Sequence, residues 1–259
     1  MASNADSFFI PNWPVPDSVG SAISLRYGGV SEGPFSSNNM AFHAGDSPVN
    51  VQANRASLIE HLNLTGSPVW LDQVHGIDVI YAPTVKGTPE ADGSYSDQAG
   101  VVCAVMTADC LPVLLCNKQG SQVAVVHAGW RGLAAGVVRK AAAKFLSHDG
   151  PLMAFLGPAI GACAFEVGAE VQQAFLDNAQ SQSHRQAIFD AFRPSDNTGR
   201  KDHYLADIYA LARGELNSCG VFDIYGGDDC TFSNPEQFYS YRREPVTGRH
   251  ATLIWLKDA

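Results

Sequence analysis

The sequence has no apolar run long enough to span a membrane, and its first residues, MASNADSFF, lack the basic and apolar segments of an export signal. Basic residues are scarce, since 17 lysines and arginines stand against 26 acidic residues and give a formal net charge of −9. A nucleic-acid polymer is therefore not expected as a ligand, because proteins that bind one usually present a basic face. We expect no membrane partner and a cytoplasmic location.

Motifs for disulfides and nucleotide binding are also missing. The sequence has no CxxC pair, and neither a Walker loop nor a GxGxxG motif is present. Without an export signal, we expect reduced thiols, most of them buried, at all six cysteines. These are Cys103, Cys110, Cys116, Cys163, Cys219 and Cys230.

Length and composition favour one folded domain. The chain has 259 residues, 46% of them hydrophobic and 17% charged, and no long Pro/Gly/Ser linker divides it, so we predict a single domain over residues 1–259. Strands are predicted at 22–30, 101–107, 111–117, 122–127 and 251–256, and helices from Ser47-Pro48, at 133–146 and around 167–175 and 205–216. Both strand-turn-strand and strand-turn-helix steps occur. The predicted fold class is therefore α/β mixed (α+β), with mixed sheets flanked by helices.

Three soft metal ligands stand in three separate motifs. They are His75 in LDQVHG, Cys110 in TADCLP and His127 in VVHAGWRG. Three protein ligands with a fourth position left for water or substrate are typical of a catalytic zinc site, whereas a structural site has four. For Cys110 alone, an inert core thiol is the commoner alternative. Asp109 beside it favours function, because a carboxylate at the end of a buried strand is costly to bury without a purpose.

The segment AGWRG could bind an anion. A strand, a glycine-bearing turn and a helix start present free backbone N–H groups, and Arg131 could add charge-assisted hydrogen bonds. An ordinary tight turn with an exposed arginine is the alternative. Other arginines that could hold a small anion are Arg26, Arg242 and Arg243. Asp92 in EADGSYS and His43 in NMAFHAGD could be turn residues or members of the site.

Ten segments together resemble the YfiH family, which is also called the laccase-domain or polyphenol-oxidase family and, in bacteria, peptidoglycan editing factor. The segments, in chain order, are LRYGGVSEGPFSSNNM, FHAGDSPVNVQANR, WLDQVHGIDVI, ADGSYS, VCAVMTADCLPVLLCN, VAVVHAGWRGLAAGV, LGPAIGACAFEVG, YLADIYALAR, GGDDCTF and SYRREPVTGRHATLIWL. Tyr27 and the stretch 38–40 depart from the family pattern. The resemblance implies a single domain of mixed sheets and a metal held by His75, Cys110 and His127.

The resemblance also implies several activities. We predict a zinc-dependent purine nucleoside enzyme that phosphorolyses adenosine, inosine and methylthioadenosine and deaminates adenosine. One alternative is an amidase that removes misincorporated L-Ser from UDP-MurNAc-L-Ser at the same three residues. Another is a copper-dependent polyphenol oxidase, which we rank lower because eight histidines without an HxH pair are few for a multicopper enzyme.

The expected cofactor is Zn²⁺, with Cu²⁺ as the alternative. The expected partner is a small molecule, either a purine nucleoside with phosphate or a muropeptide precursor, bound by a monomer or a homodimer. The residues predicted to contact substrate or phosphate are Arg26, Asn39, His43, Asp92, Asp109 and Arg131.

Overall fold

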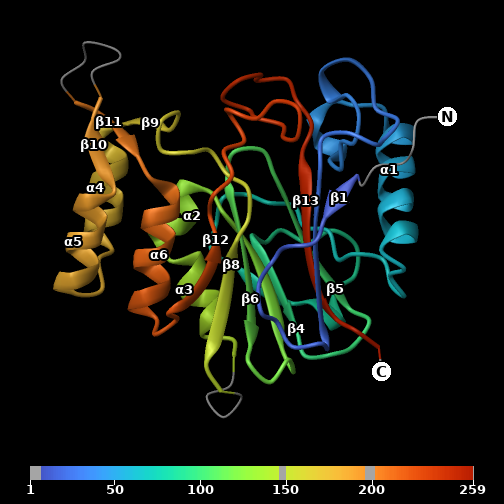
Figure 1. Ribbon diagram of the computed structural model, residues 1–259, viewed down its shortest axis with the longest axis horizontal. Coiled ribbons are helices and arrows are strands. Elements are labelled where there is room, and N and C mark those ends of the chain that lie inside the picture. The colour runs from blue at the N-terminus through green and yellow to red at the C-terminus, as the bar shows by residue number, and fades with distance from the viewer. Residues whose placement is uncertain (1–6, 146–149, 196–201, 259) are drawn as a thin grey trace.

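Two β-sheets lie face to face at the centre of the structure, a computed structural model that describes residues 7–145, 150–195 and 202–258 (Figure 1). The first sheet has the order β1 (Phe8–Phe9), β2 (Val19–Ser24), β13 (His250–Leu256) and β5 (Val102–Thr107). The second has the order β12 (Asp223–Gly226), β8 (Leu152–Leu156), β6 (Leu111–Asn117), β7 (Val123–Ala128), β4 (Gly93–Ser96) and β3 (Val79–Tyr81). The second sheet has parallel and antiparallel pairs, which confirms the predicted mixed sheets.

The continuous apolar runs of the sequence become strands that are buried on both faces. In β6, Leu114 and Cys116 face the core between the sheets, while Val113 and Leu115 pack against the core beneath the helices. This alternation follows from the two-residue period of a strand. The turn 108–110 joins β5 of the first sheet to β6 of the second, so Cys110 stands where one sheet gives way to the other.

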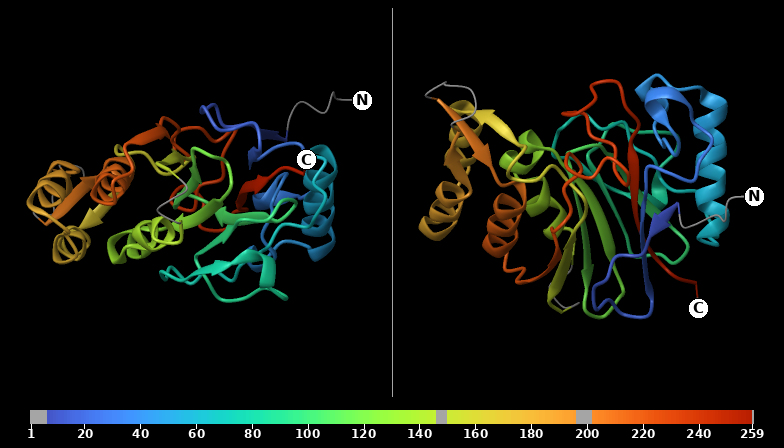
Figure 2. Two further views of the ribbon diagram at one scale, coloured as in Figure 1. Left: turned by 90° about the horizontal axis from the view of Figure 1, so that it is seen from below. Right: turned by 45° about the horizontal axis from the view of Figure 1, so that its top comes forward.

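Helices cover both outer faces (Figures 1 and 2). Helix α1 (Pro48–His61) packs Leu58 against Ala104 and Leu253 of the first sheet, and it begins at Pro48 as predicted. Helices α2 (Trp130–Ala135), α3 (Val137–Ala142) and α6 (Ile208–Ser218) cover the second sheet. Beyond them lie α4 (Ala169–Asp177), α5 (Gln182–Asp190) and a third sheet of β10 (Phe192–Pro194), β11 (His203–Ala206) and β9 (Glu166–Gly168).

Short 3-10 helices η1 (Gly33–Phe35), η2 (Phe42–Ala44) and η3 (Ala82–Thr84) complete the secondary structure in the described ranges.

The single helix predicted over 133–146 is wrong. The chain forms two helices, α2 and α3, because Gly136 between them adopts the left-handed conformation with φ of 94°. Residue 146 lies outside the described residues. The prediction of unpaired thiols is confirmed, since all six cysteines are free. The expectation that most of them are buried is wrong, because only Cys103 and Cys116 are buried and Cys163 is exposed. Within the described ranges, no helix combines the length and the apolarity that crossing a membrane requires.

Candidate active site

The three predicted ligands converge at one edge of the two sheets. His75 lies in the loop before β3, Cys110 in the turn between β5 and β6, and His127 near the end of β7. One donor atom from each residue lies within 4.8 Å of the other two. Nε2 of His75 is 3.8 Å from Sγ of Cys110, and the two imidazole rings meet edge to face with centroids 4.7 Å apart. Residues distant in sequence thus form one compact cluster, called the triad below.

Local backbone geometry positions the side chains of the triad. His75 and Asp109 adopt left-handed conformations with φ of 60° and 82°, which are uncommon for residues other than glycine. The loop that carries His75 is held against β5, because the Gln73 side chain donates to the carbonyl of Met106 at 2.8 Å and accepts from its N–H at 2.7 Å. Such sparsely populated conformations persist where surrounding contacts fix them, and they gather at functional sites.

Gly129 leaves the space that the triad occupies. A Cβ at this position would stand 2.8 Å from Cδ2 of His75, 3.1 Å from Sγ of Cys110 and 3.5 Å from Cε1 of His127. The first of these distances is shorter than side chains allow. Gly129, the first glycine of HAGWRG, is therefore required by the packing of the cluster as well as being part of a turn.

Asp92 organises the triad from behind. Its buried carboxylate lies 2.8 Å from Nδ1 of His127 and accepts the backbone N–H groups of His75 at 3.0 Å and Gly76 at 2.5 Å. The Nδ1 contact leaves Nε2 of His127 as the nitrogen free to act as a ligand. A carboxylate that fixes the tautomer of a histidine in this way is the usual partner of a metal-binding imidazole.

The electrostatics of the cluster favour a thiolate. Burial alone would raise the pKa of Cys110, but the positive charge and hydrogen bonds of His127 and His75 outweigh it and lower the pKa. Burial opposes the charged form of His127 as well, yet the negative charges of Cys110 and Asp92 raise its pKa. Although burial works against it, the hydrogen bond from His127 lowers the pKa of Asp92. The thiolate is the form of cysteine that binds metals and attacks electrophiles.

The donor set fits a metal ion. Two imidazoles and one thiolate, already close together, match the three-ligand sites that leave a fourth position open. His75, Cys110 and His127 would hold the ion.

A cavity of about 570 Å³ opens onto the triad. Much of its wall is apolar, formed by Met106, Trp130, Phe165 and Ile208. Its polar lining includes Gln73 and the triad. Small-molecule sites in proteins combine an apolar wall with a few placed polar groups in just this way.

Three of the other predicted residues line this cavity, namely His43, Asp109 and Arg131. Arg131 lies in the first turn of α2, with its guanidinium carbon 4.4 Å from the ring centre of Trp130. Helix α2 has only six residues, so its dipole contributes little to anion binding and the guanidinium is the relevant group. Asp109 uses its carboxylate inside the protein, where it accepts from Thr231 Oγ1 at 2.6 Å and from the Arg242 backbone N–H at 2.6 Å.

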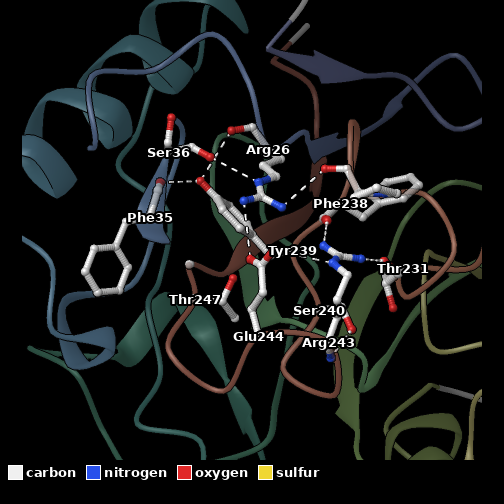
Figure 3. Close-up of polar contacts among 12 residues, drawn as sticks. Arg26, Phe35, Ser36, Thr231, Phe238, Tyr239, Ser240, Arg243, Glu244 and Thr247 are labelled. Carbon is white, nitrogen blue, oxygen red and sulfur yellow. Dashed lines mark hydrogen bonds and ion pairs between the residues drawn. The ribbon is translucent and has the colours of Figure 1, made fainter. Parts of the chain in front are cut away.

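The other three predicted residues, Arg26, Asn39 and Asp92, are not among the described residues that line the cavity. Arg26 lies in a neighbouring cluster, where it donates to the Ser36 carbonyl at 3.1 Å and pairs with Glu244 at 3.3 Å (Figure 3). Arg243 belongs to the same region, since its guanidinium donates to the carbonyls of Thr231 and Phe238 at 2.7 Å each. The hydrogen bonds and the ion pair of these side chains hold the loop between β12 and β13 in place.

Asn39 supports the cavity indirectly. Its Oδ1 accepts the backbone N–H of Arg249 at 2.9 Å, and Arg249 does line the cavity. Asn39 is fully buried, and its amide also donates to Asp46 and to the carbonyl of Ala41.

Sequence reasoning missed Arg249 and Tyr241, which line the cavity together with Arg242. Burial lowers the pKa of Arg249, and the negative charges of Cys110 and Asp109 act against this shift. Burial and the positive charge of Arg249 together lower the pKa of His43. The available signal was the position of Arg249 directly before a strand, which mirrors the placement of Cys110.

The fold and the cluster define a mixed α/β protein with a candidate metal centre in a cavity at the edge of two sheets. A family model described as multi-copper polyphenol oxidoreductase laccase matches residues 20–257, so the chain belongs to that family. Its relatives include a protein of Escherichia coli (strain K12) named purine nucleoside phosphorylase YfiH. The two are 48% identical over 251 residues, which cover 95% of this chain and 98% of the relative.

A further relative and two solved structures support the same family membership. A Haemophilus influenzae protein named purine nucleoside phosphorylase is 40% identical over 95% of this chain and 98% of its own length. A crystal structure of a Neisseria meningitidis protein has a TM-score of 0.88 and 44% identity, covering 98% of this chain and all of that one. The YlmD structure from Geobacillus stearothermophilus has a TM-score of 0.86 at 28% identity, covering 98% of this chain and 97% of that one. The predicted membership of the YfiH family is confirmed.

Proposed function

We propose that this protein is a metal-dependent purine nucleoside phosphorylase that acts on adenosine, inosine and methylthioadenosine, and that the same site deaminates adenosine. One observation carries the proposal. A nucleoside-sized cavity holds the triad and Arg131 together, in a chain 48% identical to a protein named purine nucleoside phosphorylase. The volume of about 570 Å³ falls inside the range of roughly 300–1,000 Å³ that small-molecule sites occupy.

Phosphorolysis depends mainly on positioning phosphate and the ribose of the nucleoside relative to each other. An oxygen of phosphate forms a bond to C1′ of the ribose while the bond from C1′ to N9 of the purine breaks. The purine leaves with the bonding electrons and takes up a proton. The apolar wall of Trp130, Phe165 and Ile208 would hold the base, and Arg131 would hold phosphate by its N–H donors.

The triad would hold Zn²⁺, with Cu²⁺ as the alternative, and such an ion supplies Lewis acidity toward a substrate or water oxygen. The Asp92 carboxylate accepts a hydrogen bond from Nδ1 of His127, which leaves Nε2 free to bind the ion. Deamination of adenosine needs water in place of phosphate, so the two activities differ in their demand for an anion site.

The thiolate character of Cys110 supports an alternative. A low-pKa thiol beside two imidazoles is also the pattern of a cysteine nucleophile with its base, which would suit an amidase acting on UDP-MurNAc-L-Ser. Copper-dependent phenol oxidation ranks lower. Among the described residues, one His/Cys cluster of this kind is brought together, whereas a multicopper oxidase uses several copper sites.

The test is a chromatographic assay of the metal-replete protein with adenosine, inosine and methylthioadenosine, each with and without phosphate. The proposal expects free base only when phosphate is present, and inosine from adenosine in either condition. Base release that ignores phosphate would contradict phosphorolysis. Loss of L-Ser from UDP-MurNAc-L-Ser, with all nucleosides left intact, would establish the amidase instead.

A further inference from the structure

Three arginines reach the same cavity from two parts of the chain. Arg131 belongs to α2, whereas Arg242 and Arg249 both lie in the loop between β12 and β13, with Arg249 directly before β13. Within residues 7–145, 150–195 and 202–258, no carboxylate forms an ion pair with any of these three guanidinium groups. Arg26 and Arg139, by contrast, pair with Glu244 and Glu215. The chain has a net charge of −9, so three arginines without a carboxylate partner around one cavity favour the binding of an external anion.

The register of the first sheet brings Arg249 to the triad. Strand β13 pairs antiparallel with β5, and His250 stands opposite Thr107. Arg249 therefore lies beside the turn 108–110, which carries Cys110. This closeness depends on the sheet and not on sequence neighbourhood.

Arg249 is fixed in place on one side and open on the other. Its backbone N–H donates to Asn39 Oδ1 at 2.9 Å, and its Nη1 donates to the carbonyls of Thr247 at 2.9 Å and Gly248 at 3.0 Å. In the described part of the chain, no acceptor engages Nε or Nη2 of Arg249. A guanidinium held by one nitrogen keeps its other donors oriented for a ligand, and its planar fork matches the oxygens of phosphate.

Asp109, the one carboxylate among the described residues of the lining, does not compete for these donors. Both oxygens of Asp109 are occupied, Oδ1 by Thr231 Oγ1 at 2.6 Å and Oδ2 by Ser240 Oγ at 3.1 Å and the Arg242 backbone N–H at 2.6 Å. The guanidinium of Arg242 donates to the carbonyls of Ala164 at 3.0 Å and Glu166 at 3.2 Å, which holds it at the rim of the cavity. Among the described residues of the lining, three guanidinium groups therefore stand against one carboxylate whose oxygens are already hydrogen-bonded.

We propose that Arg249 is the principal ligand of an oxyanion subsite beside the triad, with Arg242 and Arg131 completing it, and that the subsite takes a phosphate group. The inference rests on the proposed function for its choice of phosphate. The group could be free inorganic phosphate, as phosphorolysis requires, or a phosphoryl group carried by the nucleoside. Both sources present the same oxygens to the same donors.

The test measures binding rather than turnover. Inorganic phosphate is titrated calorimetrically into the metal-replete protein without nucleoside, and adenosine 5′-monophosphate is titrated separately. Arg249→Gln should weaken phosphate binding by about 10- to 100-fold, because a hydrogen-bonded charge is lost. Arg249→Lys should recover part of it by restoring the charge, and Arg131→Ala should weaken it less. Arg193→Gln, which changes an exposed arginine of β10 away from the cavity, is the matched control.

The outcomes separate this subsite from the proposed function. Metal content equal to wild type shows that each variant retains its fold. Arg249-dependent binding of phosphate without any phosphorolysis supports the subsite and refutes the phosphorylase. Arg249-dependent binding of the monophosphate, but not of free phosphate, assigns the phosphate group to the substrate. Equal phosphate and monophosphate affinities in wild type and Arg249→Gln, or no binding of either by wild type, would overturn the subsite.

Discussion

The carboxylate of Asp92 lies 2.8 Å from Nδ1 of His127, and both side chains are buried. The same carboxylate accepts the backbone N–H groups of His75 and Gly76, so one aspartate fixes two of the three triad residues. Asp92 is therefore a positioning residue, which acts through His127 and the His75 loop.

Asp92→Asn should weaken metal binding by about 10- to 100-fold, the usual cost of removing the carboxylate behind a metal-binding histidine. The amide cannot accept from all the N–H groups that now share the carboxylate, and it no longer favours the tautomer with a free Nε2. Competition titration against a chelator of known affinity measures the loss. Unchanged affinity would mean that Asp92 serves only the fold.

Gly129→Ala should also weaken metal binding, because the new Cβ would stand 2.8 Å from the His75 ring and 3.1 Å from Cys110 Sγ. We expect at least a tenfold loss in the same titration, in the range seen when groups around a metal site are disturbed. Gly214→Ala in α6 is the control, since its Cβ would meet Ala187 at 3.4 Å, an ordinary contact. Equal affinities for the two variants would show that the triad does not need this space.

In the metal-free protein, Cys110 should react with iodoacetamide at a lower pH than an ordinary thiol. Its pKa is lowered by His127 and His75 against the effect of burial, so the thiolate persists as pH falls below the usual thiol range. Mass spectrometry of the labelled protein follows each cysteine. Buried Cys103 and Cys116, whose pKa values burial raises to about 12, should stay unlabelled.

The same labelling experiment on Asp92→Asn tests whether the carboxylate supports the Cys110 thiolate through His127. Removing the negative charge beside His127 lowers the pKa of the imidazole, and a neutral imidazole no longer favours the Cys110 thiolate. The pH midpoint of Cys110 labelling should therefore move up. A wild-type midpoint in the ordinary thiol range would contradict the described electrostatics.

Acid should destabilise the fold partly through His250. Burial lowers its pKa to about 3, and its Nε2 accepts the backbone N–H of Tyr239 at 2.7 Å. The unfolded chain takes up this proton below about pH 6.5, whereas the folded protein does not until about pH 3. The stability that the neutral ring contributes is thus fully present above pH 6.5 and is lost as pH falls toward 3.

His250→Gln should remove up to one proton from the pH dependence of unfolding, about 1.4 kcal/mol per pH unit between those values. Urea unfolding at a series of pH values measures the slope for each protein. His61→Gln, at an exposed position at the end of α1, is the control. The same slope in wild type and His250→Gln would show that His250 is not held neutral.

Much of the site could be predicted from the sequence because its chemistry is local. Cys110 and His127 each adjoin a strong apolar strand, and their residue types alone suggest a metal. Asp92 was ambiguous, since aspartates are common in turns and its contact with His127 forms only when β4 pairs with β7. The break at Gly136 was missed because a single glycine within a helical pattern is often tolerated.

Arg249 could not be placed near Cys110 from sequence, because that contact requires β13 to add to β5 in one register. The positions of Arg26 and Asn39 were beyond prediction for a similar reason. Their polar side chains are satisfied by partners such as Glu244 and the Arg249 backbone, which the chain brings near only through tertiary packing.

The most direct measurement is the metal content of the protein and of three variants, His75→Ala, Cys110→Ser and His127→Ala, by inductively coupled plasma mass spectrometry after removal of loosely bound ions. The triad should hold one zinc per chain in wild type and far less in each variant, with circular dichroism showing that all remain folded. Wild-type protein that retains no stoichiometric metal after growth with zinc, or variants that retain as much as wild type, would contradict a metal centre at His75, Cys110 and His127.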